Sequence, residues 1–207
     1  MILRTIFSCV IAFNLFLATA NGQLIRSFGV KAGLCVANQT WHQSQQVINL
    51  NPSARVGADI GCFVEWLSLP VVSVSTEASY VQRGFNSTIT FGANGSYSES
   101  VRADYLSFPV LAKIRNQLGP VELYGLVGPR LDVLLHTDDA GYSRETINQS
   151  RATELGGTFA VGIQAFQPGA IQLGAEIRYS PSFQDAYANE VLSVRNHSVD
   201  LLLLMSF

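Results

Sequence analysis

Apolar side chains recur at every second position through most of the sequence after residue 27. A period of two places successive apolar side chains on one face of a β-strand, whereas an amphipathic helix needs a period of 3.6. The pattern therefore predicts an all-β chain whose strands each have one apolar face. Eight segments show the alternation: 28–36, 56–66, 72–80, 106–114, 121–133, 155–165, 171–179 and 198–207.

The connections between these segments alternate in length. Four long, polar connections cover residues 38–53, 84–104, 136–151 and 180–196, and three short ones cover residues 67–70, 116–120 and 167–169. Outer-membrane β-barrels have this arrangement, with long loops outside the cell and short turns in the periplasm. An even number of strands also brings the chain back to the side from which it arrives. Glu99 falls in a long connection, so we expect its replacement to have little effect.

The alternation alone is compatible with a soluble β-sandwich as well as with a transmembrane barrel. The segments have the length that a tilted strand needs to cross a bilayer. The apolar face ends in Trp66, Tyr80, Tyr179 and Phe207, as an interfacial aromatic girdle would. The charges on the opposite face nearly balance, as an enclosed interior requires. We therefore predict an eight-stranded antiparallel up-and-down transmembrane β-barrel over residues 27–207.

The polar face of the predicted strands carries the charged residues that would line the barrel. Eight strands enclose a space only wide enough for side chains, so these residues would form a salt-bridged core rather than a water-filled pore. Arg83 shares this face, and Glu122 would have Arg115 or Lys113 opposite it across a short turn. The predicted structural network consists of Lys31, Asp59, Glu65, Glu77, Lys113, Arg115, Glu122, Arg130, Asp132, Glu154, Glu176, Arg178 and Asp200.

Residues 1–20 have the composition of a secretory signal peptide. Arg4 precedes an almost entirely apolar run over residues 5–17, and Ala18-Thr19-Ala20 provides the small residues of a cleavage site. We predict cleavage around residues 20–22. The apolar run is too short for a membrane-spanning helix.

Few residues have the spacing of a catalytic or metal site. The candidates are His136, Asp138, Asp139 and Ser143 on one predicted outer loop, and the isolated His42 and His197. A hydrolase could place His and Asp at the rim of a barrel, but the favoured interpretation is a solvated polar loop. We predict no enzyme activity, cofactor or metal. The formal net charge of −2 argues against a nucleic-acid partner.

Several short motifs occur in a familiar order. They are Gly29-Val30-Lys31-Ala32-Gly33-Leu34, Tyr80-Val81-Gln82-Arg83-Gly84, Tyr105-Leu106-Ser107-Phe108-Pro109-Val110-Leu111-Ala112-Lys113, Gly128-Pro129, Ile177-Arg178-Tyr179 and the terminal Phe207. With these motifs the chain resembles the outer-membrane β-barrel family that includes PorT-like proteins of Bacteroidetes-type bacteria. The resemblance implies an eight-stranded barrel in the bacterial outer membrane. Phe207 is similar to the terminal signal that the barrel-assembly machinery reads.

The expected partners are therefore outer-membrane lipid and the barrel-assembly machinery, together with secretion-system or cell-surface partners at the long loops. We expect a non-catalytic protein with a structural or accessory role. Two alternatives stay open. One is a narrow channel for ions or small solutes. The other is an accessory component of a protein secretion system, which is the role linked to the member that gave the PorT-like group its name.

Overall fold

The computed structural model describes residues 25–43, 51–67, 69–90, 96–138, 151–166, 171–185, 187–188 and 192–207. The predicted signal peptide lies outside these residues. The strands are β1 (Ile25–Gln43), β2 (Asn51–Trp66), β3 (Val72–Thr90), β4 (Ser96–Leu118), β5 (Val121–Asp138), β6 (Thr153–Phe166), β7 (Gln172–Pro181), β8 (Tyr187–Ala188) and β9 (Leu192–Ser206). In the described part of the chain, no helix is long and apolar enough to cross a membrane.

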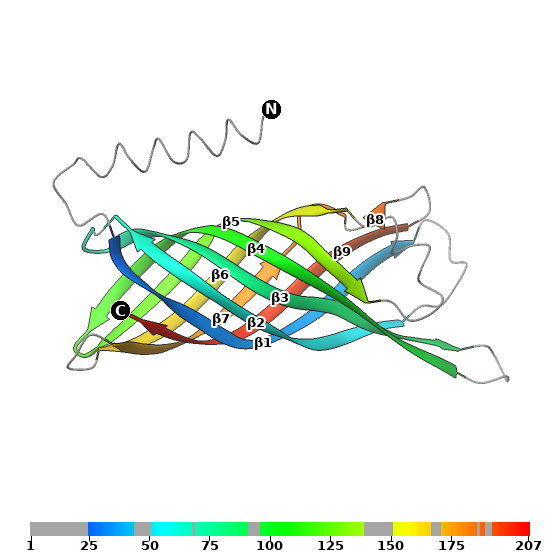
Figure 1. Cartoon of the computed structure of the whole chain (residues 1–207), viewed down its shortest axis with the longest axis horizontal. Coiled ribbons are helices and arrows are strands. Elements are labelled where there is room, and N and C mark those ends of the chain that lie inside the picture. Colours follow the sequence, from blue (N-terminus) through cyan, green and yellow to red (C-terminus); the bar gives the residue numbers. More distant parts are fainter. Residues whose placement is uncertain are drawn as a thin grey trace, which may run out of the picture.

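The strands form a closed antiparallel ring (Figure 1). Each long strand pairs with the next long strand in the sequence, and β9 pairs with β1 to complete the ring. The two-residue strand β8 pairs with β9 at the rim. Eight long strands in an up-and-down ring confirm the predicted architecture.

Alternate side chains of each strand point into and out of the ring. In β9, Leu202 and Leu204 are buried, whereas Leu201 is 55% exposed and Leu203 is 70% exposed. The same alternation holds in β5, where Glu122 is buried next to the exposed Leu123. A soluble sandwich would bury its apolar face and expose its charges. The ring does the opposite, as a barrel surrounded by lipid must.

The two ends of the ring differ. Phe28 and Phe207 exchange two backbone hydrogen bonds, with N–O distances of 3.3 and 2.8 Å, and their rings stack at 5.7 Å. This seam brings the start of β1 beside the end of β9. The short connections β2–β3, β4–β5 and β6–β7 lie at this same end, which we call the turn end. The opposite end is the loop end.

The turn between β4 and β5 is tighter than the sequence suggested. Only Gly119 and Pro120 separate the two strands, and Gly119 has a φ of 62°, a conformation that suits a residue without a side chain. Across this turn Gln117 pairs with Glu122, and Arg115 pairs with Tyr124. The predicted placement of Arg115 or Lys113 directly opposite Glu122 is therefore wrong, because it assumed a different turn length.

The strands extend beyond their apolar segments at the loop end. β4 has 23 residues and pairs with β3 as far as Thr90 and Ser96, and Figure 1 shows this hairpin projecting past the rest of the barrel. Most of the predicted 84–104 connection is therefore strand. Glu99 lies in β4 and is 4% exposed, so the prediction that it sits on a loop is wrong. The expectation that its replacement has little effect therefore loses its basis. The apolar pattern ends at the bilayer, but hydrogen-bonded Ser- and Thr-rich strands continue above it.

Aromatic residues mark both ends of the outward apolar face. At the turn end, Trp66 donates its Nε1–H to Thr76 Oγ1 at 2.7 Å, and Phe207 is half exposed. Toward the loop end, the Tyr80 hydroxyl accepts a hydrogen bond from Arg102 Nη2 at 3.1 Å. Amphipathic aromatic side chains with polar partners are typical of membrane interfaces. The apolar belt between them is the surface that meets lipid.

We expect Leu203→Arg to lower the free energy of unfolding in lipid vesicles by about 2–4 kcal/mol, because it places a guanidinium in the apolar belt. The matched control is Thr40→Arg, an outward position at the loop end whose register partner is Arg195. There the loss should be at most about 1 kcal/mol. Urea unfolding in vesicles measures both values, and equal losses would contradict the assignment of faces.

Candidate functional site

Charged side chains from all eight long strands meet inside the ring. The thirteen residues of the predicted network are each at most 8% exposed. Arg83, which shares their face, is 3% exposed. An ionised group in such surroundings needs partners of opposite charge. The structure groups most of these side chains into three clusters, which follow one another from the turn end to the loop end.

The turn-end cluster consists of Arg26, Glu65, Lys113, Arg115 and Glu122. Glu65 lies 3.0 Å from Lys113 Nζ, 2.8 Å from Arg115 Nη2 and 3.2 Å from Arg26 Nε. Glu122 lies 2.9 Å from Lys113 Nζ and 3.4 Å from Arg26 Nη2. Three cations thus share two carboxylates. The Arg115 guanidinium is close to Glu65, but its nitrogens make no aligned hydrogen bond with the described residues.

Arg26 was not among the predicted residues. The pairing of β1 with β2 shifts between Ile25 and Ser27, so Arg26 is the extra residue of a β-bulge. A bulge redirects a side chain, and here it brings Arg26 to Glu65 and Glu122 inside the ring. Strict alternation from Phe28 backwards gives no sign of this irregularity. The sequence therefore offered no signal for Arg26 beyond its charge.

The central cluster consists of Lys31, Glu77, Glu176 and Arg178, with Tyr124 as a neutral donor. Lys31 Nζ lies 2.8 Å from Glu77 Oε1 and 2.9 Å from Glu176 Oε2. Arg178 Nη2 lies 2.7 Å from Glu77 Oε2 and 2.6 Å from Glu176 Oε1. The Tyr124 hydroxyl donates to Glu176 Oε2 at 3.0 Å. Each cation bridges both carboxylates, so the charges in this cluster balance.

Two ion pairs cross the whole width of the ring. Arg26 on β1 reaches Glu122 on β5, and Arg178 on β7 reaches Glu77 on β3. In both pairs the strands lie on opposite sides of the eight-stranded ring. We call these two pairs the cross-braces. They connect walls that share no backbone hydrogen bonds.

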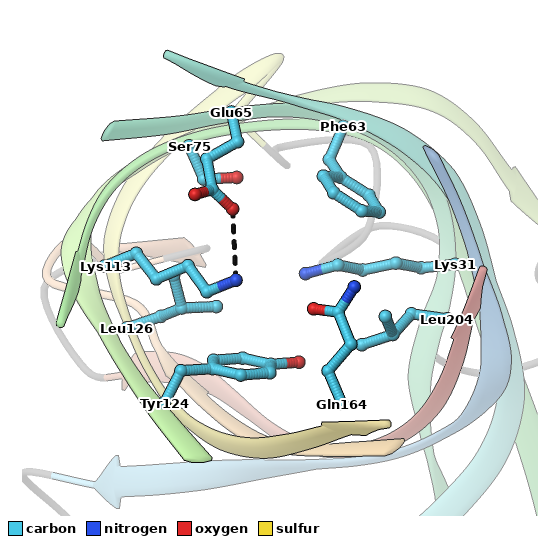
Figure 2. Close-up of a pocket in the computed structure, with 9 residues that line it drawn as sticks. All are labelled: Lys31, Phe63, Glu65, Ser75, Lys113, Tyr124, Leu126, Gln164 and Leu204. Atoms are coloured by element: carbon cyan, nitrogen blue, oxygen red, sulfur yellow. Dashed lines mark hydrogen bonds and ion pairs between the residues drawn. The ribbon is translucent and has the colours of Figure 1, made fainter. Parts of the chain in front are cut away.

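The space between the first two clusters is filled by side chains. Figure 2 shows Lys31 and Lys113 entering from opposite walls, with Tyr124 and Gln164 below them. Lys113 Nζ lies 4.3 Å from the centre of the Tyr124 ring, close enough for a cation–π interaction. The cavity that these side chains line has a volume of about 10 Å³. That is about the space required for one water molecule.

The loop-end cluster consists of Arg83, Arg130 and Asp132. Asp132 Oδ2 lies 2.5 Å from Arg83 Nη1 and 2.8 Å from Arg130 Nε. Arg130 also donates to the carbonyl oxygen of Gly157 at 3.2 Å. The Arg83 guanidinium lies over the Tyr105 ring, 5.3 Å from its centre. Two guanidinium groups therefore converge on one carboxylate.

Three predicted network residues make no ion pair with the described residues. Glu154 instead accepts hydrogen bonds from the Tyr105 hydroxyl at 2.8 Å, Ser182 Oγ at 2.9 Å and Asn196 Nδ2 at 2.9 Å. Asp59 and Asp200 are also buried, with 3% and 1% exposure, and Asp200 pairs in register with Arg178 of the central cluster. Ion pairing across the ring depends on how far along the barrel axis each residue lies and on the length of its side chain. The alternation of side chains along a strand predicts neither.

The candidate catalytic and metal-binding residues do not assemble into a site in the described structure. His136 and Asp138 are exposed near the loop end of β5, and His197 lies in β9. Asp139 and Ser143 lie outside the described residues, as does the side chain of His42. Among the described residues, no group of three His, Cys, Asp or Glu side chains could hold a metal ion.

Comparison with known proteins places this ring among outer-membrane barrels. Residues 21–188 match the family described as "Outer membrane protein beta-barrel domain". A search of curated proteins gives no match. The crystal structure of the outer membrane protein OprG from Pseudomonas aeruginosa is similar at a TM-score of 0.56 and 12% identity, covering 90% of this chain and 98% of OprG.

The outer membrane protease OmpT from Escherichia coli is also similar in structure. Its TM-score is 0.50 at 8% identity, with 90% of this chain and 97% of OmpT covered. Identities this low indicate a shared fold alone, and one protein with this fold is a protease, so the fold does not decide whether a chain is an enzyme. The family match covers most of the chain. Outer-membrane barrels have their short turns in the periplasm, so the turn end of this ring is the periplasmic end. This chain belongs to the outer membrane protein beta-barrel domain family, and its place is the bacterial outer membrane.

Proposed function

We propose that this protein is a non-catalytic component of the outer membrane with a closed interior, and that it has a structural or accessory role exerted at its loop end. The observation that carries the proposal is the filled interior. Two cross-braces join opposite walls at successive heights, and the cavity between them has a volume of about 10 Å³. A hydrated ion needs more space than this cavity offers.

The predicted charge network acts in this proposal as the core of the barrel. Except for Arg130, whose partner Asp132 lies on the same strand, its lysines and arginines contact carboxylates of other strands. These contacts oppose both widening of the ring and slippage of the register. Leu111, Leu126 and Leu204 fill the space between the charged layers. A buried ion pair adds little net stability compared with apolar packing. Removing one partner of the pair, however, leaves an unpaired charge in a low-dielectric interior.

A narrow channel is a second candidate, and one observation favours it. From the middle of the ring toward the loop end, several buried polar atoms have no hydrogen-bond partner among the described residues: Ser79 Oγ, Arg83 Nε, Asp132 Oδ1, Thr158 Oγ1 and Asp200 Oδ1. Water ordinarily satisfies such atoms. A hydrated loop half would leave the central and turn-end clusters as the constriction, and conduction would require both cross-braces to open.

The resemblance to PorT-like proteins supports a third candidate, an accessory role in protein secretion. The longest shared motif covers residues 105–113, and its Tyr105, Pro109, Leu111 and Lys113 are all buried inside the ring. The motif therefore concerns the barrel interior. Contacts with an export partner would have to lie elsewhere, and the long strands at the loop end are the surface we propose for them.

Phe207 is the residue that we propose as the signal for the barrel-assembly machinery. It follows the last strand, is 44% exposed and pairs with Phe28 across the seam that closes the ring. A machinery that recognises Phe207 would hold the end of β9, the strand that closes the ring by pairing with β1. The Phe207 side chain is 44% exposed with the seam formed, so it stays accessible in the closed barrel.

We expect the purified mature protein to show no discrete conductance in planar lipid bilayers. A double variant, Arg26→Ala with Arg178→Ala, removes both cross-braces and should leak ions. Arg195→Ala removes the exposed ion pair with Asp185 and should stay silent. Steady openings of the wild-type protein, with the heat-dependent gel mobility of a folded barrel, would favour the channel instead.

Glu176→Gln should lower the free energy of unfolding in lipid vesicles by about 3–5 kcal/mol, because it leaves Lys31 and Arg178 short of a buried carboxylate. Asp185→Asn makes the same chemical change in an exposed pair and should cost less than about 1 kcal/mol. Urea titrations followed by gel mobility give both values. Similar small losses would indicate that water reaches the central cluster.

The secretion candidate predicts that deleting the gene blocks the release of exported proteins into the medium, and that the wild-type gene restores it. The comparison is between culture supernatants of the deletion strain and the complemented strain, with the outer-membrane fraction checked for integrity. Unchanged export from cells with an intact outer membrane would remove this candidate and leave the structural role.

A further inference from the structure

The outer surface of the barrel contains an apolar groove across β4 to β7. Its volume is about 490 Å³, and its lining includes Ile114, Gly125, Val127, Phe159, Val161 and Ile177. Sites for small molecules have volumes of about 300–1,000 Å³. The groove is therefore large enough for a ligand, and it faces away from the charged interior.

Gly125, which has no side chain, forms the floor of the groove. Gly125 in β5 pairs with Ile114 on one side and Val161 on the other, and the side chains of these neighbours form the walls. A Cβ at Gly125 would meet nothing closer than the Ala160 carbonyl oxygen at 3.9 Å. At Gly128, in contrast, a Cβ would collide with the backbone of Val110. Backbone packing requires glycine at position 128 but not at position 125.

The surroundings of the groove identify its occupant as hydrocarbon. Val161 is 64% exposed and Ile177 is 56% exposed, so the groove is continuous with the apolar belt that meets lipid. Its described lining carries no charge, and the Tyr179 hydroxyl is its one polar side-chain group. Water is absent at this depth, and an unfilled groove would lose the dispersion contacts of its walls.

A second copy of the chain fits the groove less well. In a two-fold dimer the same patch of both subunits meets, and two hollow surfaces do not fill each other. Specific protein interfaces also carry a polar rim and about one hydrogen bond per 100–200 Å². The lining offers one hydroxyl group. A flexible acyl chain needs no such partners.

The position of the groove along the strands places it near the middle of the apolar belt. Gly125 lies four residues beyond Val121, the periplasmic end of β5. At about 3.3 Å per residue and a tilt of about 40°, this places Gly125 roughly 10 Å above the turn end, in an apolar belt about 25 Å tall. Tyr179 lies seven residues beyond Gln172, so the groove ends above mid-depth. We propose that the groove holds an acyl chain of a membrane phospholipid.

Photolabelling in vesicles tests this proposal. The mature protein is reconstituted in phosphatidylethanolamine and phosphatidylglycerol with a trace of phospholipid carrying a diazirine on one acyl chain, and labelled peptides are quantified by mass spectrometry. We expect Ile114 and Val161 to be labelled several-fold more than Leu203, which is more exposed but lies outside the groove. If the labelling of Ile114, Val161 and Leu203 in the wild-type protein simply follows the exposure of their side chains, the proposal is overturned.

Two variants sharpen the test. Gly125→Leu fills the groove and should reduce the labelling of Ile114 and Val161 several-fold. Ala32→Leu adds a larger side chain at an outward position of β1, outside the groove, and should leave that labelling unchanged. Both should keep the heat-dependent gel mobility of a folded barrel. A wild-type dimer in light scattering that Gly125→Leu converts to monomer would assign the groove to a second copy and overturn the lipid assignment.

Discussion

Backbone hydrogen bonding inside a bilayer is the constraint on which this structure depends. Hydrocarbon offers no partners to N–H and C=O groups, so each strand needs a protein neighbour on both sides. The pairing of β9 with β1, from Gly29 and Ser206 to Gln43 and Leu192, meets this requirement by closing the ring. Closure then gives every strand one face toward lipid and one face toward an enclosed space. The alternation in the sequence is the consequence of these two environments.

A ring of eight strands makes the enclosed space narrow, and this decides how the interior charges are satisfied. Little water fits between the clusters, so carboxylates and cations must satisfy one another. The two cross-braces show how this is done, because Arg26 reaches Glu122 and Arg178 reaches Glu77 across the full width of the ring. Glu154 makes no ion pair with the described residues and accepts hydrogen bonds from three neutral donors instead. Buried polar atoms without a hydrogen-bond partner among the described residues remain in both halves, at Arg115 near the turn end and at Arg83 and Asp132 near the loop end.

The two-residue period was sufficient to predict the ring and to place Lys31, Glu176 and Arg178 on one face, because side-chain direction alternates along any extended strand. It could not predict the bulge at Arg26 or the register at Gly119–Pro120, since one added residue shifts a pairing without altering the apolar pattern. The two-residue period also failed to predict the strands beyond the bilayer, since Glu99 lies in β4 although the sequence placed it in a loop. Partners across the ring, and the groove above Gly125, arise from strands that are distant in sequence.

The most direct test of this account is paramagnetic broadening of the methyl signals of β9 by NMR, with the protein in lipid nanodiscs. A spin label on the lipid chains should broaden Leu201 and Leu203 and spare Leu202 and Leu204. A water-soluble paramagnetic agent should also spare Leu202 and Leu204, because the interior is closed. Broadening of Leu202 and Leu204 by the soluble agent would contradict the closed interior, and broadening of them by the lipid label would reverse the two faces.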